Sequence, residues 1–139
     1  MFGKILHAND GSEHAFHALA LAIKIARENN AELHMVSVEE IDYMPEFMEE
    51  VREETGTAAR RFHTVVQRAR EMAEENQVKL HTHVVAGHAV RDVVQLAADL
   101  DVGLLVIGAT GHSQIYERML GTRAARIVHL AQCPVLVVR

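Results

Sequence analysis

The sequence predicts a single α/β domain with a doubly wound, five-stranded parallel sheet and helices on both faces. Short apolar runs typical of buried strands alternate along the chain with longer segments in which apolar residues recur at helical spacing. Turn and helix-start residues separate the two kinds of segment. Alternation of strand and helix is what a parallel sheet requires, because each crossover is right-handed and covers one face of the sheet.

The first three elements are predicted from local signals. A strand over Lys4–Ala8 is apolar at its centre and runs into turn and N-cap residues from Asn9 to Ser12. A helix over Glu13–Glu28 follows, because apolar side chains recur along one face until two consecutive asparagines end it. The next apolar run, Glu32–Val38, has the length of a strand.

An acidic segment separates these elements from the next helix. Between Glu39 and Glu54 there are eight acidic residues and one basic residue, a composition typical of a solvated connection. Helical spacing resumes at Thr57, and apolar residues share one face as far as Ala73. This stretch predicts the clearest amphipathic helix of the chain.

The second half of the chain repeats the alternation of strand and helix. Strands are predicted over Val78–Ala86, Val102–Ile107 and Pro134–Val138, with helices over Ala89–Leu100 and Thr122–Ala131 between them. The central strand of these three is apolar throughout, as a strand buried on both faces should be.

Composition excludes several classes of protein. A chain of 139 residues has room for one hydrophobic core, so we expect residues 1–139 to form one domain. The formal net charge of −5 argues against a nucleic-acid partner, whose phosphates attract Lys and Arg. With no secretory signal, no run long enough for membrane insertion and a single cysteine, Cys133, we expect a cytoplasmic protein.

A spaced set of glycines follows the fourth predicted strand. Gly108, two residues, Gly111, nine residues, Gly121 and then Thr122 lead into the last helix. Glycine lets backbone amides approach phosphate oxygens, and a helix start adds unpaired N–H groups at the positive end of its dipole. Glycines also mark ordinary turns, but the position of this set between a buried strand and a helix start favours a polyphosphate site.

This glycine spacing resembles the signature of the ATP-binding branch of the universal stress protein family. The resemblance extends over nearly the whole chain, through Lys4–Leu6, Asp10–Ser12, Gly87, Gly108–Ser113 and Cys133–Val138. It implies the strand order 3-2-1-4-5, in which the turns after strands one and four flank the point where the winding reverses. Ligands of open α/β sheets bind at such a point.

By matching position, the resemblance implies a site for ATP, ADP or AMP, with the need for Mg²⁺ left open. The adenosine end would be lined by Ala8, Asn9, Asp10, Val38, Ile107 and Gly108. The phosphates would be held by Gly111, Gly121, Thr122, Arg123 and, where a basic residue is common in the family, His112. Because histidine is only partly protonated near neutrality, phosphate affinity is expected to weaken as the pH rises.

Two of these residues also have purely structural interpretations. Asp10 either accepts hydrogen bonds from the ribose, or helps to place a metal ion, or is only a turn or cap residue beside Asn9 and Gly11. Val38 either presents its backbone to the adenine edge or is an ordinary core residue.

Three hypotheses about activity stand at this point. The first is a nucleotide-responsive stress or regulatory module without catalysis, because the chain lacks a Walker lysine and has no placed base beyond Asp10. The second is a slow ATP hydrolase. The third is a histidine-rich metal-binding protein, since His14 and His17 share a helix face and His81 and His83 share a strand face. In the sequence, however, no evident cysteine or carboxylate completes either histidine pair as a ligand set.

The last strand predicts a homodimer. Val135–Val138 forms an apolar strand at the open edge of a parallel sheet, and open edges tend to be paired. Antiparallel pairing with a second copy gives a twofold interface, as the resemblance also implies. A regulatory protein partner is compatible with this assembly.

Overall fold

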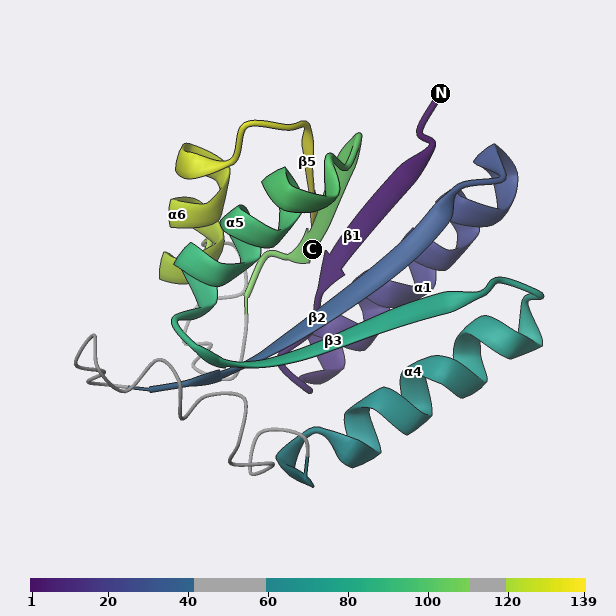
Figure 1. The fold of residues 1–139 in the computed structure, drawn as a ribbon, viewed down its shortest axis with the longest axis horizontal. Helices are drawn as coiled ribbons and strands as arrows, with labels where there is room; N and C mark the ends of the chain where they lie inside the picture. The colour runs from purple at the N-terminus through teal and green to yellow at the C-terminus, as the bar shows by residue number, and fades with distance from the viewer. Residues whose placement is uncertain (42–59, 111–119) are drawn as a thin grey trace.

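The computed structural model describes residues 1–41, 60–110 and 120–139, and Figure 1 shows their arrangement. The elements are β1 (Lys4–Ala8), α1 (Glu13–Asn29), β2 (Glu32–Glu40), α4 (His63–Glu75), β3 (Leu80–Gly87), α5 (Ala89–Leu100), β4 (Leu104–Gly108), α6 (Thr122–Leu130) and β5 (Val135–Val138). The predicted order of strands and helices is confirmed. The predicted helix start at Thr57 and most of the acidic segment lie outside the described residues. None of the described helices is both long enough and apolar enough to cross a membrane.

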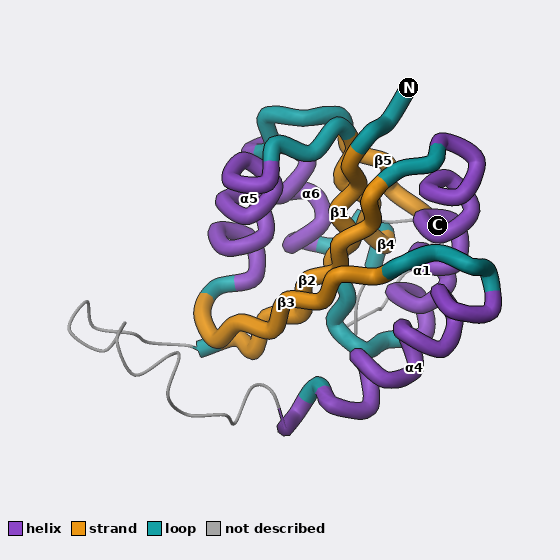
Figure 2. Tube along the Cα trace, turned by 45° about the vertical axis from the view of Figure 1, so that its right-hand side comes forward, coloured by secondary structure: helices purple, strands orange, loops and turns teal. Residues whose placement is uncertain are grey.

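All the strands pair in parallel in one sheet of order β3-β2-β1-β4-β5, which confirms the expected doubly wound fold. The chain moves outward from β1 to β3, then returns past β1 and continues outward to β5. Helices α1 and α4 therefore cover one face of the sheet, and α5 and α6 cover the other (Figures 1 and 2).

Successive side chains of the central strands pack alternately into two separate hydrophobic cores. Ile5 of β1 packs in the cluster under α1 and α4, whereas its neighbour Leu6 packs in the cluster under α5 and α6. Both side chains are fully buried. In β4, Val106 and Ile107 divide between the two cores in the same way. A central strand that is apolar at every position is stabilised on both faces, which explains the continuous apolar run in the sequence.

The ends of α1 follow the cap residues that the sequence contains. Ser12 is the N-cap, and its hydroxyl oxygen accepts a hydrogen bond from the Ala15 N–H at 3.2 Å. Asn30 ends the helix in the left-handed conformation, with φ of 50°. Local chemistry therefore fixes this helix to within one residue of the prediction.

Strand β2 is longer than predicted, ending at Glu40 rather than Val38. Glu39 pairs with Ala86 and Glu40 with Gly87, and the Ile41 N–H donates to the Gly87 carbonyl at 2.8 Å. Glutamate is uncommon in strands, but one Glu40 carboxylate oxygen accepts the Ala89 N–H at the start of α5, at 2.8 Å. This tertiary contact outweighs the local preference.

A histidine lies within the core under α1. His7 on β1 is fully buried, and its Nδ1 lies 3.0 Å from the Val106 carbonyl oxygen, which accepts its proton. Burial lowers the pKa of His7 to about 4, although the Val106 carbonyl and Asp10 favour the charged form. The fold therefore holds this imidazole neutral at physiological pH.

We expect His7 to make the fold sensitive to mild acid. Because its pKa in the folded state lies below the ordinary value of 6.5, its contribution is complete above that pH and is lost as the pH falls towards 4. Between pH 7 and pH 5 the wild type should lose about 2 kcal/mol more unfolding free energy than His7→Gln. Urea unfolding at both pH values measures this difference, and parallel losses in the two proteins would contradict it.

Candidate functional site

The carboxyl ends of β1 and β4 lie side by side at the centre of the sheet. His7 pairs with Val106, so Ala8 and Ile107 follow as the next residues on adjacent strands. The helices that follow them, α1 after β1 and α6 after β4, lie on opposite faces of the sheet (Figure 1). This is the reversal point at which ligands of such sheets bind.

The turn after β1 is held by its own side chains. The Asn9 side-chain oxygen accepts the Gly11 N–H at 2.8 Å, and one Asp10 carboxylate oxygen accepts the Ser12 N–H at 2.9 Å. Gly11 has φ of +88°, a conformation that favours glycine. Asp10 therefore has the turn role that the sequence left open, at the start of α1.

Val38 lies on the part of β2 that extends beyond β1. The last β1 contact is the hydrogen bond from the Asn9 N–H to the Val36 carbonyl, at 2.9 Å. Residues two apart on a strand direct their backbone groups to the same side, so Val38 turns its N–H and C=O past the end of β1. Its side chain packs against the core under α5 and α6, which matches the core interpretation. The two interpretations of Val38 are thus compatible.

Gly121 lies very close to the backbone that follows β4. Its N–H donates to the Ala109 carbonyl at 2.7 Å, and a β-carbon at this position would lie 3.2 Å from the same oxygen. At Gly108 a β-carbon would be in ordinary contact, 3.5 Å from the His14 carbonyl oxygen. Loop packing alone is therefore a reason for glycine at 121. Gly111 and His112 lie outside the described residues.

The first turn of α6 has no side-chain cap. Its N-cap is Gly121, and Thr122 and Arg123 are exposed. The first N–H groups of a helix have no partner within the helix, so this end can accept an anion. The α6 start adjoins the end of β2, because Arg123 Nη2 lies 3.8 Å from a Glu40 carboxylate oxygen.

Glu40 joins three elements at this edge, and no sequence motif marks it. One Glu40 carboxylate oxygen accepts the Ala89 N–H and lies near the Arg123 guanidinium. The other oxygen lies 3.4 Å from His88 Nδ1. In the sequence Glu40 is one of eight acidic residues between Glu39 and Glu54, so only the fold distinguishes it.

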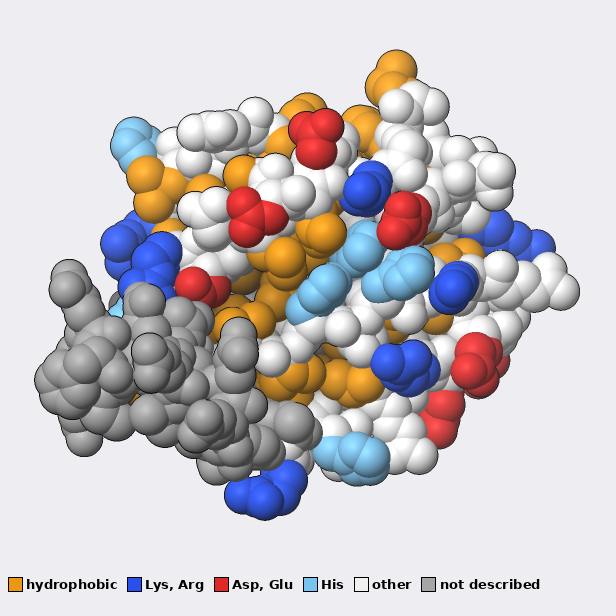
Figure 3. Space-filling model, viewed as in Figure 1, with side chains coloured by type: hydrophobic (Ala, Val, Ile, Leu, Met, Phe, Trp, Pro, Cys, Tyr) orange, Lys and Arg blue, Asp and Glu red, His pale blue; other side chains and the backbone are white. Residues whose placement is uncertain are grey.

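A second polar cluster lies on β2 and β3, on the sheet face that α5 and α6 cover elsewhere. Glu32, His34 and His81 place one ligand-type atom each within 4.8 Å of one another. His34 Nε2 lies 2.9 Å from a Glu32 carboxylate oxygen, and His34 Nδ1 lies 2.9 Å from His83 Nε2. The hydrogen bond from His34 lowers the pKa of Glu32, while burial and the neighbouring histidines lower the pKa of His83. Figure 3 shows histidine side chains gathered beside an acidic one on this face.

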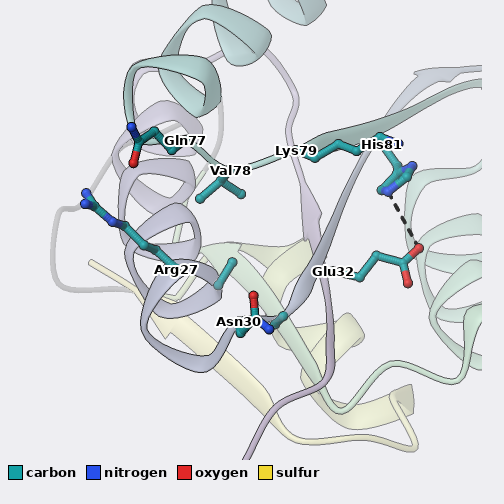
Figure 4. Close-up of a pocket in the computed structure, with 9 residues that line it drawn as sticks. Arg27, Asn30, Glu32, Gln77, Val78, Lys79 and His81 are labelled. Carbon is teal, nitrogen blue, oxygen red and sulfur yellow. Dashed lines mark ion pairs between the residues drawn. The ribbon is translucent and has the colours of Figure 1, made fainter.

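Only part of this cluster could be recognised in the sequence. His81 and His83 form a pair on one strand face with no evident carboxylate beside them, whereas the fold supplies Glu32 and His34 from β2. Among the described residues this is the group with metal-ligand geometry, and the exposed His14 and His17 are not part of it. A hollow of about 550 Å³ beside the cluster is lined by Glu32, His81, the end of α1 and the adjoining turns (Figure 4).

Comparisons with known proteins agree with the resemblance noted in the sequence. The model of the universal stress protein family matches residues 1–139. The universal stress protein YxiE of Bacillus subtilis is 33% identical, with full coverage of both chains. A universal stress protein of Methanocaldococcus jannaschii is 32% identical, covering 100% of this chain and 83% of its own.

Solved structures share the fold over nearly all of this chain. The universal stress protein UspA from Lactobacillus plantarum has a TM-score of 0.81 and 26% identity, covering 99% of this chain and 97% of its own. A universal stress protein solved in complex with cAMP has a TM-score of 0.75 and 24% identity, with coverage of 99% and 97%. One from Arabidopsis thaliana with AMP bound has a TM-score of 0.65 and 18% identity, with coverage of 98% and 90%.

Proposed function

This chain belongs to the universal stress protein family, and on that premise we propose that it binds an adenine nucleotide and acts as a nucleotide-responsive regulatory module of one domain. The observation that carries the proposal is the reversal of winding between β1 and β4, with the uncapped start of α6 at the same edge. The ligands of two solved relatives, cAMP and AMP, support the ligand class. ATP, ADP and AMP share the adenosine that this edge would recognise.

The adenosine end of the proposed site rests on backbone groups. The N–H and C=O of Val38 face the space beyond the end of β1, where they can pair with the polar edge of adenine. Ala8, Asn9 and Asp10 on one side and Ile107 and Gly108 on the other adjoin that space. The carboxylate of Asp10 would accept from a ribose hydroxyl while it holds the turn before α1.

The phosphate end rests on the start of α6. Uncapped amides, the exposed Thr122 hydroxyl and the Arg123 guanidinium together provide donors and positive charge for phosphate oxygens. Gly111, His112 and Gly121 complete this end by sequence match. Arg123 pairs with Glu40 at 3.8 Å, so phosphate binding would exchange one anionic partner for another.

Binding without rapid turnover is the activity that we propose. Hydrolysis needs a group that orients water against the transferring phosphoryl group. One Asp10 carboxylate oxygen already holds the Ser12 N–H, which favours a positioning role over that of a general base.

We expect Arg123→Gln to weaken binding of ADP and ATP by about tenfold or more, because a charge-assisted hydrogen bond to phosphate is lost. Adenosine binding should change little. The matched control is Arg126→Gln, which removes the same charge from an exposed position on the same helix. Calorimetric titration of nucleotide-free protein measures the affinities, and mass spectrometry of small molecules released on denaturation identifies any resident nucleotide.

Two results would contradict the nucleotide proposal. One is the absence of adenine-nucleotide binding at millimolar concentration; the other is equal weakening by Arg123→Gln and Arg126→Gln. Gly121→Val is a poor test, because its β-carbon would crowd the Ala109 carbonyl at 3.2 Å whether or not a ligand binds there.

We further propose that the chain forms a homodimer through β5. Among the described strands β5 lies at one edge of the sheet. The carbonyls of Pro134, just before β5, and of Val138 accept hydrogen bonds from the N–H groups of Leu105 and Ala109, so they face β4. Val135 and Val137 alternate with these residues, so their backbone groups face outward. A second copy can pair with that row in antiparallel fashion.

We expect Val137→Pro to produce monomers. Proline removes the outward N–H of Val137 but leaves the pairing between β4 and β5 intact, since proline is tolerated on an edge strand at such a position. Leu136→Pro is the contrast, because it removes an inward N–H and should destabilise the fold itself. Molar mass from light scattering during size exclusion measures the change, and a folded Val137→Pro dimer would place the interface elsewhere.

A further inference from the structure

We propose that Glu32, His34 and His81 bind one divalent transition-metal ion of the Zn²⁺ class on the exposed part of the β2 and β3 face. Two imidazoles and one carboxylate are a ligand set that such ions accept, with remaining positions open to water. The set comes from two adjacent strands that are paired in parallel along the sheet. No loop has to move to assemble it.

The register of the sheet brings the ligands together. His34 and His81 are directly paired between β2 and β3, and Glu32 lies two residues before His34 on the same face. The imidazole rings of His34 and His81 stack with centroids 4.7 Å apart and an interplanar angle of 21°. All three side chains therefore extend from the same face of the sheet and lie within two residue positions of one another along the strands.

The separations of the ligand atoms fit a single ion. Bonds of about 2.0–2.2 Å at a tetrahedral centre place neighbouring ligand atoms about 3.4 Å apart. The Glu32 carboxylate oxygen lies 2.9 Å from His34 Nε2 and 3.7 Å from His81 Nε2. Because the His34 and His81 rings now lie nearly parallel, metal binding requires rotations of these side chains that turn both ring planes towards one ion and adjust both distances. The metal then replaces the proton that His34 Nε2 now shares with Glu32.

His83 supplies the outer contact that a metal-bound histidine usually needs. It lies on the same face as His81, and its Nε2 is 2.9 Å from His34 Nδ1. When His34 binds metal through Nε2, its remaining proton resides on Nδ1 and is donated to His83 Nε2. Such a hydrogen bond fixes the tautomer and orientation of the ligand.

The pattern along the strands separates this site from the core. On the same face, Val36 and Val38 of β2 and Val85 of β3 pack under α5 and α6. The preceding positions on both strands carry the ligands and His83, of which Glu32 is exposed, His81 and His83 are half-buried and His34 is buried. Glu32 and His81 also line the hollow in Figure 4, so solvent reaches this side of the cluster.

The test is Zn²⁺ titration of tag-free, chelator-treated full-length protein, with the visible absorption of Co²⁺ as a second readout. We expect one ion per chain in the wild type. Glu32→Gln and His81→Gln should each weaken binding by at least tenfold, and His83→Gln should do so by about 10- to 100-fold through loss of the outer contact. Glu32 and His81 are not fully buried, so these two variants should keep the fold, which thermal unfolding checks.

The matched control is His17→Gln, which removes an exposed histidine from α1 and should leave Zn²⁺ affinity unchanged. The proposal is overturned if the wild type binds no ion, if Glu32→Gln and His81→Gln bind as tightly as the wild type, or if His17→Gln weakens binding equally. Nucleotide affinity should be the same in all these variants. A failure of nucleotide binding would leave this result unaffected, because the two sites use different residues.

Discussion

The handedness of parallel crossovers determines where this molecule has open surfaces. A right-handed connection places α1 and α4 on one face as the chain moves from β1 to β3, and the same rule places α5 and α6 on the other face when it returns to β4. The helices that follow β1 and β4 therefore lie on opposite faces, with the carboxyl edge of the sheet between them. The last strand, β5, becomes an edge, and the part of β2 and β3 that the second helix pair does not reach stays polar. Each proposed site lies on one of these surfaces.

Much of the fold could be predicted because its signals are local. Ser12 caps α1 with its own hydroxyl, Asn30 ends the helix in a left-handed conformation, and the apolar run of β4 is continuous because that strand is buried on both faces. The order of the strands in the sheet, by contrast, does not follow from local signals. Alternation of strand and helix allows several orders of a parallel sheet, and the one found here was expected from resemblance to a family rather than from the residues themselves.

The contacts that sequence patterns missed join residues far apart in the chain. His34 and His81 meet only because β2 and β3 pair in one particular register, and a shift of one residue in either strand would send one of them to the opposite face. Glu40 is similar, since its carboxylate reaches the start of α5 and Arg123 on α6. Gly121 illustrates the converse limit. Its spacing suggested a phosphate site, yet its close contact with the Ala109 carbonyl also favours a glycine, so the pattern alone cannot separate the two causes.

The burial of His34 favours a role beyond packing. Only 6% of this residue is exposed, and a buried imidazole beside a carboxylate must recover the cost of lost hydration through its hydrogen bonds. His34 has partners at both nitrogens, Glu32 and His83, so that cost is offset. Polar networks of this kind often stabilise a fold no more than apolar side chains of similar size would. Two residues further along the same face, Val36 fills its position with an apolar side chain under α5. A polar array in place of another valine is therefore better explained by what its nitrogen and oxygen atoms can bind than by the stability they add.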